Sequence, residues 1–267
     1  TAWEMVNMIW DAGVPRDVLQ FLPVEDGPIG QQLICDRRVD GVILTGAWET
    51  ADMFRRWRPD LRLFAETSGK NGMIISAAAD LDLAIKHLVT GAFGHAGQKC
   101  SASSLGLIAA DVYDSQSFRD KLVDAASSLV VGPSENPSAV VTPVIREPDE
   151  VLRRGLEKLD AGERWLLKPT TLDGHRRLWS PGIRLGVTED SWYRNHECFG
   201  PVLGLIRVRD VDEAVKILNR SEFGLTGGIH TLNPAEIDRF VEQVEVGNAY
   251  VNRPTTGAIV RRQPFGG

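Results

Sequence analysis

The chain has 267 residues, of which 43% are hydrophobic and 25% are charged, which is ordinary usage for a globular protein. This composition excludes a disordered, collagen-like or low-complexity chain, and the length predicts one large domain or two small ones. Thirty Lys and Arg residues against 36 Asp and Glu residues give a formal net charge of −6. Because phosphate neutralisation needs clustered basic residues, we expect no nucleic-acid partner.

Three cysteines are too few for a disulfide framework and suit a reducing, cytoplasmic compartment. Neither the cysteines nor the five histidines have the spacing of a zinc site, so no metal is expected. No apolar run approaches the roughly 18–20 residues of a transmembrane helix. The chain opens at Thr1 without Met or a leader and stops in a glycine turn, so we expect an internal fragment of a longer protein.

Residues 1–66 alternate between helical and strand spacing. Helices are predicted in the apolar-periodic segment before Gly13, at 28–37 and at 50–58, where Pro59 ends the last one. Short strands are predicted at 18–22 and 61–66, and a buried strand at 41–45. This β-α-β order predicts a parallel sheet with helical crossovers.

The alternation continues along the rest of the chain, so we predict an α/β fold throughout. Strands are expected at 73–75, 105–108, 202–208 and 248–252, and helices at 81–93, 118–129, 149–159, 211–218 and 235–244. Residues 94–101 are expected to form a glycine-punctuated turn, and residues 132–148 a loop. The polar segment Glu66-Thr-Ser-Gly-Lys-Asn71 indicates a boundary between domains at 1–67 and 68–267.

Cys100 is the first candidate for chemistry. A lone cysteine is more often an inert core residue, and Cys35, within an apolar helical segment, is interpreted that way. Cys100 differs because it ends the polar, glycine-containing segment Gly94-His-Ala-Gly-Gln-Lys-Cys100. The glycines allow a close backbone approach, and the neighbouring Lys99 favours the thiolate.

Glu66 is the second candidate, because it ends an apolar strand. A carboxylate in that position is often a plain surface residue. In an α/β sheet, however, the carboxyl ends of the strands face the ligand crevice. A carboxylate buried there has a raised pKa and suits a general base.

Two further segments are weak when taken alone. Glu197-Cys-Phe-Gly-Pro201 reads as a turn before a strand, in which Cys198 is a packing residue rather than a nucleophile. The loop from Gly257-Ala258 to Pro264-Phe-Gly-Gly267 has backbone N–H groups of the kind that hold a carboxylate. Without other information, a flexible loop is the better explanation.

Together, these segments resemble the motifs of the aldehyde dehydrogenase superfamily, in the same order. Glu66-Thr-Ser-Gly-Lys-Asn71 resembles Glu-Leu-Gly-Gly-Lys, Gly97-Gln-Lys-Cys100 resembles Gly-Gln-x-Cys, and Glu197-Cys-Phe-Gly-Pro201 matches Glu-x-Phe-Gly-Pro. Further signatures match at Thr45-Gly46, Phe223-Gly-Leu-Thr-Gly227, Gly247-Asn-Ala-Tyr-Val-Asn252 and Pro264-Phe-Gly-Gly267. The resemblance covers nearly the whole chain. It implies a truncated Rossmann-like cofactor domain at 1–67 and a catalytic domain at 68–267, a parallel sheet with flanking helices.

Within that superfamily, the sequences around Cys100 and at Thr255-Thr-Gly-Ala-Ile-Val260 are similar to those of 1-pyrroline-5-carboxylate dehydrogenases. These enzymes oxidise glutamate 5-semialdehyde to glutamate with NAD. The likeness is greatest to the dehydrogenase part of bacterial proteins that also carry a proline dehydrogenase domain. The implied ligands are therefore NAD and a small carboxylated aldehyde.

The resemblance also implies roles for individual residues. Cys100 attacks the aldehyde to form a thiohemiacetal, hydride passes to nicotinamide, and Glu66 activates the water that hydrolyses the resulting thioester. The cofactor-binding residues implied are Thr45, Gly46, Gly30, Glu197 and Phe199. The substrate-binding residues implied are Ser101, Gly257, Ala258 and Phe265, with the N–H groups of Gly257 and Ala258 on the α-carboxylate.

Three departures from the family pattern affect these assignments. Val24-Glu-Asp26 stands where a Gly-x-Gly is usual, and Ala47 stands where many members have Ser. Arg261 replaces a glycine that is common in the substrate loop of this subfamily, and its side chain is expected to crowd the loop or change its backbone angles. The substrate is therefore less firmly indicated than the chemistry.

Members of the family also carry segments that this sequence lacks. Before the equivalent of Thr1 they have most of the cofactor sheet, an Asn of the oxyanion hole and a Lys for the adenosine ribose, and they end in strands that help form a dimer. We therefore expect a homo-oligomeric parent, and a chain that by itself folds but is inactive, because losing one oxyanion donor alone costs about a hundredfold in rate. Exposed sheet edges are expected to favour self-association.

Two alternatives stay open. The substrate is another carboxylated semialdehyde, or the chain is a non-catalytic structural piece that does not bind NAD. The choice between NAD and NADP is also open, because the residues that usually decide it precede the equivalent of Thr1. A titration of this chain with NAD separates the catalytic from the structural interpretation.

Overall fold

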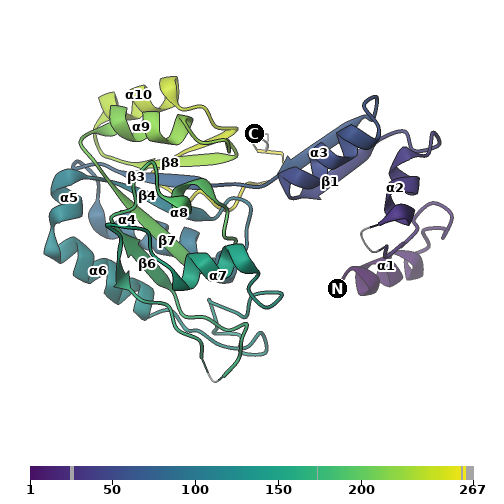
Figure 1. Cartoon of the computed structure of the whole chain (residues 1–267), viewed down its shortest axis with the longest axis horizontal. Coiled ribbons are helices and arrows are strands. Elements are labelled where there is room, and N and C mark those ends of the chain that lie inside the picture. The colour runs from purple at the N-terminus through teal and green to yellow at the C-terminus, as the bar shows by residue number, and fades with distance from the viewer. Residues whose placement is uncertain (25–26, 173, 260, 263–267) are drawn as a thin grey trace. The chain divides into compact units, whose positions relative to one another are not determined.

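The computed structural model describes residues 1–24, 27–172, 174–259 and 261–262 (Figure 1). By its internal contacts the chain divides into two compact units, Thr1–Thr67 and Ser68–Gly267. Each unit has its own sheet, and both sheets are built mainly from parallel strands joined by helices. The predicted α/β class is therefore confirmed. Among the described residues, no helix is both long enough and apolar enough to cross a membrane.

The first unit is a small β-α-β arrangement preceded by two helices. In chain order its elements are α1 (Ala2–Asp11), α2 (Pro28–Cys35), β1 (Val42–Gly46), α3 (Trp48–Trp57) and β2 (Leu63–Thr67). Strands β1 and β2 pair in parallel, with Thr45 opposite Glu66 and Gly46 opposite Thr67. The carboxyl ends of the two strands therefore lie side by side, which is the arrangement that the alternating sequence pattern predicts.

Two expectations for this unit are wrong. Residues 18–22 do not form a strand, because Pro15 starts a turn in which its carbonyl oxygen accepts hydrogen bonds from the amides of Val18 and Leu19. The strand predicted at 41–45 exists but is not buried. Its Ile43 side chain is 87% exposed, because the two-residue period of a strand places Ile43 on the face opposite that of half-buried Val42 and Leu44.

The second unit is built on a seven-stranded sheet in the described part of the chain. Its spatial order is β5 (Arg164–Leu167), β6 (Gly182–Leu185), β7 (Val202–Val208), β4 (Ser103–Ala109), β3 (Asn71–Ile75), β8 (Thr226–His230) and β9 (Asn248–Val251). All neighbouring strands pair in parallel except the edge pair β5–β6. The central strand β3 is buried at all five positions, which accounts for its continuous apolar run Met73-Ile-Ile75.

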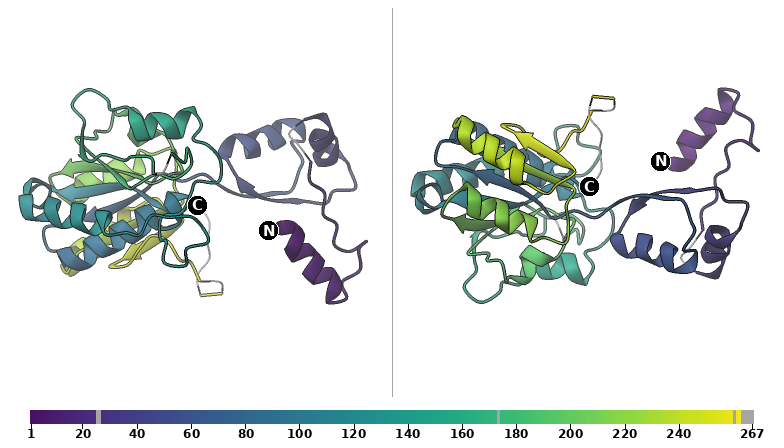
Figure 2. Two further views of the ribbon diagram at one scale, coloured as in Figure 1. Left: turned by 90° about the horizontal axis from the view of Figure 1, so that it is seen from below. Right: turned by 90° about the horizontal axis from the view of Figure 1, so that it is seen from above.

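Helices cover both faces of this sheet, as Figure 2 shows. They are α4 (Leu81–Phe93), α5 (Ala110–Asp114), α6 (Gln116–Ser127), α7 (Glu150–Glu157), α8 (Trp192–Asn195), α9 (Val211–Asn219) and α10 (Pro234–Gln243). Leu88 of α4 reaches Gly106, whereas Leu218 of α9 reaches Gly72. Gly72 is in register with Leu105, the residue before Gly106, so the two glycines face opposite sides of the sheet. Helices α4 and α9 therefore enclose the two halves of the core.

The long elements of this unit follow the sequence predictions closely. The predicted helix at 81–93 is α4, and the Asp80 carboxylate accepts the amide hydrogen of Leu83 as its N-cap. The strand predicted at 202–208 is β7. The sequence analysis does not anticipate β5, β6, β8, α5 and α8, each of which has only four or five residues. Elements this short contain too few residues for a periodic pattern.

A fully buried ion pair holds the antiparallel edge of the sheet. Arg184 of β6 and Glu163, just before β5, have exposed side-chain fractions of 1% and 0%, and their charged groups lie 2.6 Å apart. The Arg184 guanidinium also donates to the carbonyl oxygens of Gly155 and Lys158, at the C-terminal end of α7. One arginine thus joins helix α7 to the β5–β6 pair.

We expect Glu163→Ala to lower the free energy of unfolding by about 3–5 kcal/mol, because it leaves the buried Arg184 charge without its carboxylate. Lys121→Ala is the matched control. Its partner Asp82 lies at 2.7 Å, but the two side chains are 54% and 75% exposed, and such a pair contributes about 0–1 kcal/mol. Urea unfolding of the whole protein measures both changes. Equal losses in the two variants would contradict the assigned role of the buried pair.

Candidate active site

Cys100 lies at the amino-terminal edge of the second unit's sheet. Helix α4 ends at Phe93, the 3₁₀ turn η1 (Gly94–Gly97) follows, and Cys100 comes three residues before β4 begins. Its side chain is half-buried. The predicted glycine-punctuated turn at 94–101 is therefore present, and it delivers the cysteine to the start of a central strand.

Three successive residues before Cys100 have left-handed backbone angles. The φ angles are 54° at His95, 54° at Ala96 and 69° at Gly97. For residues with a Cβ this conformation costs about 1–2 kcal/mol each, and it persists only where surrounding contacts enforce it. These three residues reverse the direction of the chain, so that the turn packs against the loop that contains Glu197.

The carbonyl oxygens of the cysteine turn are held by a buried amide. The Nδ2 group of Asn71, at the start of β3, donates to the carbonyl oxygen of Cys100 at 2.6 Å and to that of Ala102 at 2.9 Å. Its Oδ1 accepts the amide hydrogen of Thr226, at the start of β8, at 3.0 Å. Asn71 is 2% exposed. It therefore links three strand starts through one side chain.

The buried side chain of Thr255 binds the Ser101 carbonyl, which lies between the Cys100 and Ala102 carbonyls in the chain. The Thr255 hydroxyl donates to the carbonyl oxygen of Ser101 at 2.9 Å and lies 2.8 Å from the Ser103 hydroxyl. The amide of Ala102 donates back to the carbonyl oxygen of Lys99 at 3.0 Å. Each carbonyl from Lys99 to Ala102 thus accepts a defined hydrogen bond.

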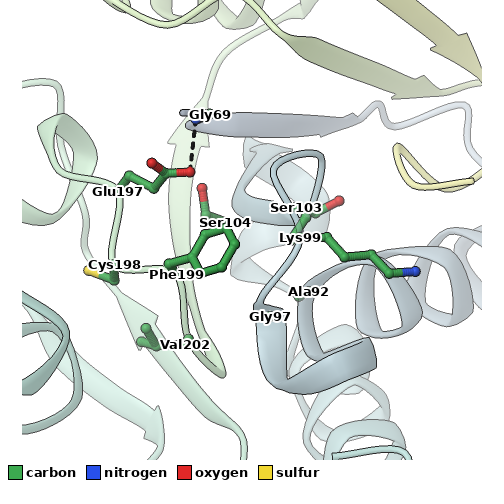
Figure 3. Close-up of a pocket in the computed structure, with 12 residues that line it drawn as sticks. Gly69, Ala92, Gly97, Lys99, Ser103, Ser104, Glu197, Cys198, Phe199 and Val202 are labelled. Atoms are coloured by element: carbon green, nitrogen blue, oxygen red, sulfur yellow. Dashed lines mark hydrogen bonds between the residues drawn. The ribbon is translucent and has the colours of Figure 1, made fainter. Parts of the chain in front are cut away.

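Glu197 contacts the same region through Gly69, as Figure 3 shows. The amide of Gly69 donates to Glu197 Oε1 at 2.9 Å. A Cβ at Gly69 would lie 2.2 Å from the carbonyl oxygen of Cys100, so only glycine fits there. The residues lining the adjoining pocket include Gly69, Gly97, Lys99, Ser104, Glu197 and Phe199. The polar segment after β2, the cysteine turn and the Glu197 loop therefore meet at one place.

The cysteine turn and the Glu197 loop approach each other closely at Gly97 and Gly200. A Cβ on Gly97 would lie 2.2 Å from the carbonyl oxygen of Gly200. The preceding Phe199 has a φ of 52° and a 44% exposed side chain, and it borders the pocket. The backbone contact thus holds an aromatic ring at the rim of the pocket.

Lys70 is a buried residue that the sequence analysis did not single out. It is 3% exposed, its Nζ lies 3.7 Å from the centre of the Tyr193 ring, and the described residues offer its ammonium no hydrogen-bond acceptor. Burial lowers the pKa of Lys70 to about 8. The sequence signal for it is its match to the final lysine of the Glu-Leu-Gly-Gly-Lys motif. The Tyr193 ring thus takes the place of the anion that usually accompanies a buried lysine.

The other two cysteines have surroundings that differ from those of Cys100. Cys198 is 7% exposed, its Sγ packs against Gly155, and burial raises the pKa of its thiol. A buried thiol with a raised pKa is a poor nucleophile. Cys35 is half-buried at the end of α2, with its Sγ 3.7 Å from the carbonyl oxygen of Trp57. Both environments suit packing residues.

In the first unit, the predicted site residues Thr45, Gly46 and Glu66 lie at the carboxyl ends of β1 and β2. Thr45 and Glu66 are register partners, and α3 begins two residues after Gly46 without a side-chain cap. Burial raises the pKa of the Glu66 carboxyl. Gly30 lies in the first turn of α2. An uncapped helix N-terminus after a strand fits the phosphate groups of a dinucleotide.

The predicted substrate loop follows β9. Gly257 has a φ of 87°, Gly257 and Ala258 are exposed, and the Gly257 carbonyl accepts a hydrogen bond from Arg253 at 3.2 Å. Ser101 is 6% exposed. Arg261 keeps a left-handed φ of 67°, so this arginine retains a glycine-like backbone conformation. Phe265 lies outside the described residues.

Comparison with known proteins identifies what this arrangement resembles. The sequence profile described as the aldehyde dehydrogenase family matches residues 1–267. A 1-pyrroline-5-carboxylate dehydrogenase from Bacillus subtilis is 36% identical over 275 residues, which cover all of this chain and 53% of that protein. The chain therefore spans about half the length of the curated relatives it matches.

Two solved structures extend this likeness to three dimensions. Proline utilization A (PutA) from Corynebacterium freiburgense has a TM-score of 0.94 and 46% identity, over 99% of this chain and 27% of that one. A 1-pyrroline-5-carboxylate dehydrogenase from Thermus with bound NAD has a TM-score of 0.88 and 31% identity, over 98% of this chain and 52% of that one. The fold is therefore the aldehyde dehydrogenase fold.

We expect Gly97→Ala to lower the free energy of unfolding by about 2 kcal/mol or more, because the new methyl meets the Gly200 carbonyl in a left-handed conformation. Gly94→Ala is the control. Gly94 has a φ of −55°, and a Cβ there would have no atom within 4 Å, so we expect a change within about 0.5 kcal/mol. Denaturant unfolding compares the two, and similar values would show that the Gly97–Gly200 contact is not tight.

Proposed function

The chain belongs to the aldehyde dehydrogenase family, and from that premise we propose that the whole protein oxidises glutamate 5-semialdehyde to glutamate with NAD. The observation that carries the proposal is the meeting of the Gly69–Asn71 segment, the Cys100 turn and the Glu197 loop at one edge of the sheet. The names of the relatives supply the substrate.

In this proposal Cys100 is the nucleophile. Its thiolate attacks the aldehyde carbon and forms a carbon–sulfur bond, and the backbone N–H of Cys100 donates to the resulting oxyanion. The Cys100 N–H shares its peptide plane with the Lys99 carbonyl, which accepts the amide hydrogen of Ala102 at 3.0 Å, so this N–H is oriented before the reaction begins. The hydrogen bonds from Asn71 and Thr255 fix the next two peptide planes of the turn. NAD, when bound, supplies the hydride acceptor that turns the thiohemiacetal into a thioester.

Glu66 then acts as the general base in thioester hydrolysis. Its carboxylate removes a proton from the attacking water, which adds to the thioester carbon and releases glutamate and the Cys100 thiol. Burial raises the Glu66 pKa, which brings a carboxylate closer to the value of an efficient base near neutral pH. No other carboxylate of β1 or β2 is in a comparable position.

Five residues are assigned to the cofactor in this proposal. Thr45 and Gly46, with Gly30 in α2, offer a strand end and helix N-termini for the phosphates. Glu197 is assigned to the nicotinamide ribose and Phe199 to the nicotinamide end. NAD bound to the Thermus relative supports a nicotinamide dinucleotide as the cofactor of this protein.

The substrate carboxylate is assigned to the loop after β9. The N–H groups of Gly257 and Ala258 hold the α-carboxylate, Ser101 adds a hydroxyl, and Phe265 packs on the aliphatic stem. The left-handed φ of Arg261 supports the same backbone path despite the loss of a glycine. Another carboxylated semialdehyde is the second candidate substrate, because Arg261 adds a long cationic side chain to this loop.

The units have separate roles in this proposal. Residues 1–67 belong to the dinucleotide-binding domain and residues 68–267 to the catalytic domain. The PutA likeness supports a parent in which a proline dehydrogenase domain supplies the semialdehyde, and we propose that the parent is a homo-oligomer. Because this chain spans about half of its relatives, we expect it alone to bind NAD weakly and to show no turnover. An NAD titration of the 267-residue chain tests this.

We expect Cys100→Ala to abolish NADH formation from glutamate 5-semialdehyde in the whole protein. Cys35→Ala and Cys198→Ala are the controls and should keep most of the activity, because those thiols serve packing. The measurement is NADH absorbance at steady state. Turnover by Cys100→Ala would refute the assigned nucleophile. Loss of activity in all three variants would contradict the assignment of Cys35 and Cys198 to packing alone.

Glu66→Gln is expected to keep a pre-steady-state burst of NADH but to slow steady turnover, because hydride transfer precedes the step that needs the base. Stopped-flow absorbance separates the two phases. The raised pKa means that wild-type turnover falls as the pH drops through a value above the ordinary 4.5 of a glutamate. Glu66→Gln should lack this acidic limb. Loss of the burst itself would assign Glu66 a different role.

A further inference from the structure

From the buried hydrogen bonds around Thr255, we propose that this residue is a positioning residue that fixes the distance between the substrate loop and Cys100. The inference rests on the proposed function and adds a determinant of substrate length to it. Thr255 lies between the two places that hold the substrate. It is two residues before Gly257, and its hydroxyl bonds to the residue after Cys100.

The direction of its hydrogen bonds follows from the number of protons available. The Thr255 hydroxyl has one hydrogen, and this hydrogen is donated to the carbonyl oxygen of Ser101 at 2.9 Å. The Ser103 hydroxyl, 2.8 Å from Thr255 Oγ1, must therefore be the donor in that contact. Thr255 both donates and accepts, so its side chain cannot rotate without breaking two bonds.

The Thr255 side chain is closely packed on all sides that the neighbouring glycines border. Thr255 is 0% exposed. A Cβ at Gly228 of β8 would lie 3.1 Å from the Thr255 methyl group, and a Cβ at Gly91 of α4 would lie 2.7 Å from the Ser103 hydroxyl. Two glycines thus leave just enough room for this pair of hydroxyl groups, and the enclosed side chain acts as a fixed point of the loop.

The chain has a second fixed point before Thr255, at Asn252. Asn252, with a φ of 52°, accepts the Thr231 amide hydrogen at 3.0 Å through Oδ1 and donates to the Thr231 carbonyl at 2.9 Å through Nδ2. Between Asn252 and Thr255 the path of the chain is therefore determined at both ends. The exposed residues Gly257 and Ala258 begin only two residues beyond the Thr255 anchor.

This anchoring matters only to a substrate that is held at both ends. An aldehyde with an α-carboxylate is bound by the loop and attacked by Cys100, so an error in the separation of the two misplaces the reacting carbon. An aldehyde without a carboxylate is held at the thiol end and does not depend on that separation. Removal of the Thr255 hydroxyl should therefore affect the two substrates differently.

The test is Thr255→Val in the whole protein, because this substitution keeps the shape of the side chain and removes the hydroxyl. Thr255→Ser, which keeps the hydroxyl, is the matched control. We expect Thr255→Val to lower kcat/KM for glutamate 5-semialdehyde about tenfold or more, and that for butanal less than about threefold. Thr255→Ser should restore the glutamate semialdehyde value to within about threefold of wild type. Thermal unfolding confirms that each variant is folded.

Equal losses on both aldehydes would overturn the proposal, because they indicate a purely structural role, and so would the absence of any loss. If Thr255→Val does not fold, Thr255→Cys replaces it, since a thiol is a weak donor, and must show the same selective loss. Failure of the proposed function is seen separately in the wild-type protein. In that case wild type shows no preference for the carboxylated aldehyde over butanal.

Discussion

The end of the second unit that contains Cys100 depends on one constraint, which is that the carbonyl groups of the turn from Lys99 to Ala102 must be hydrogen-bonded without regular secondary structure. Asn71 satisfies two of them, Thr255 one and the turn itself one. A buried carbonyl without a donor costs about 1–3 kcal/mol, so these two side chains decide whether the turn exists. Other features, including the left-handed run and the glycine contacts, follow from packing against this turn.

The position of the turn departs from the usual rule for α/β proteins. Ligands are expected at the carboxyl ends of parallel strands, and the Thr45–Glu66 pair in the first unit obeys this rule. Cys100, Asn71 and Thr226, by contrast, all lie at the amino ends of β4, β3 and β8. At these amino ends, the Asn71 amide and the Thr255 hydroxyl orient the backbone of the cysteine turn.

This difference explains what the sequence could and could not predict. Long periodic segments such as 81–93 and 202–208 and the glycine-rich cysteine turn are visible because they are local patterns. Asn71 and Thr255 are not, because their function depends on partners 29 and 154 residues away in the chain. The exposure of Ile43 and the short strands β5, β6 and β8 were missed for a similar reason, since tertiary pairing rather than local pattern determines them.

The dual use of Asn71 has a consequence for the chemical ageing of the protein. Hydrolysis of its amide to a carboxylate would place acceptor oxygens against the Cys100 and Ala102 carbonyls, where donors are required. The next residue is Gly72, whose backbone nitrogen would have to fold back onto the Asn71 side chain for cyclisation. Strand pairing of Gly72 with both β4 and β8 holds that nitrogen in an extended chain. The same sheet that uses the amide therefore shields it from the reaction that would destroy it.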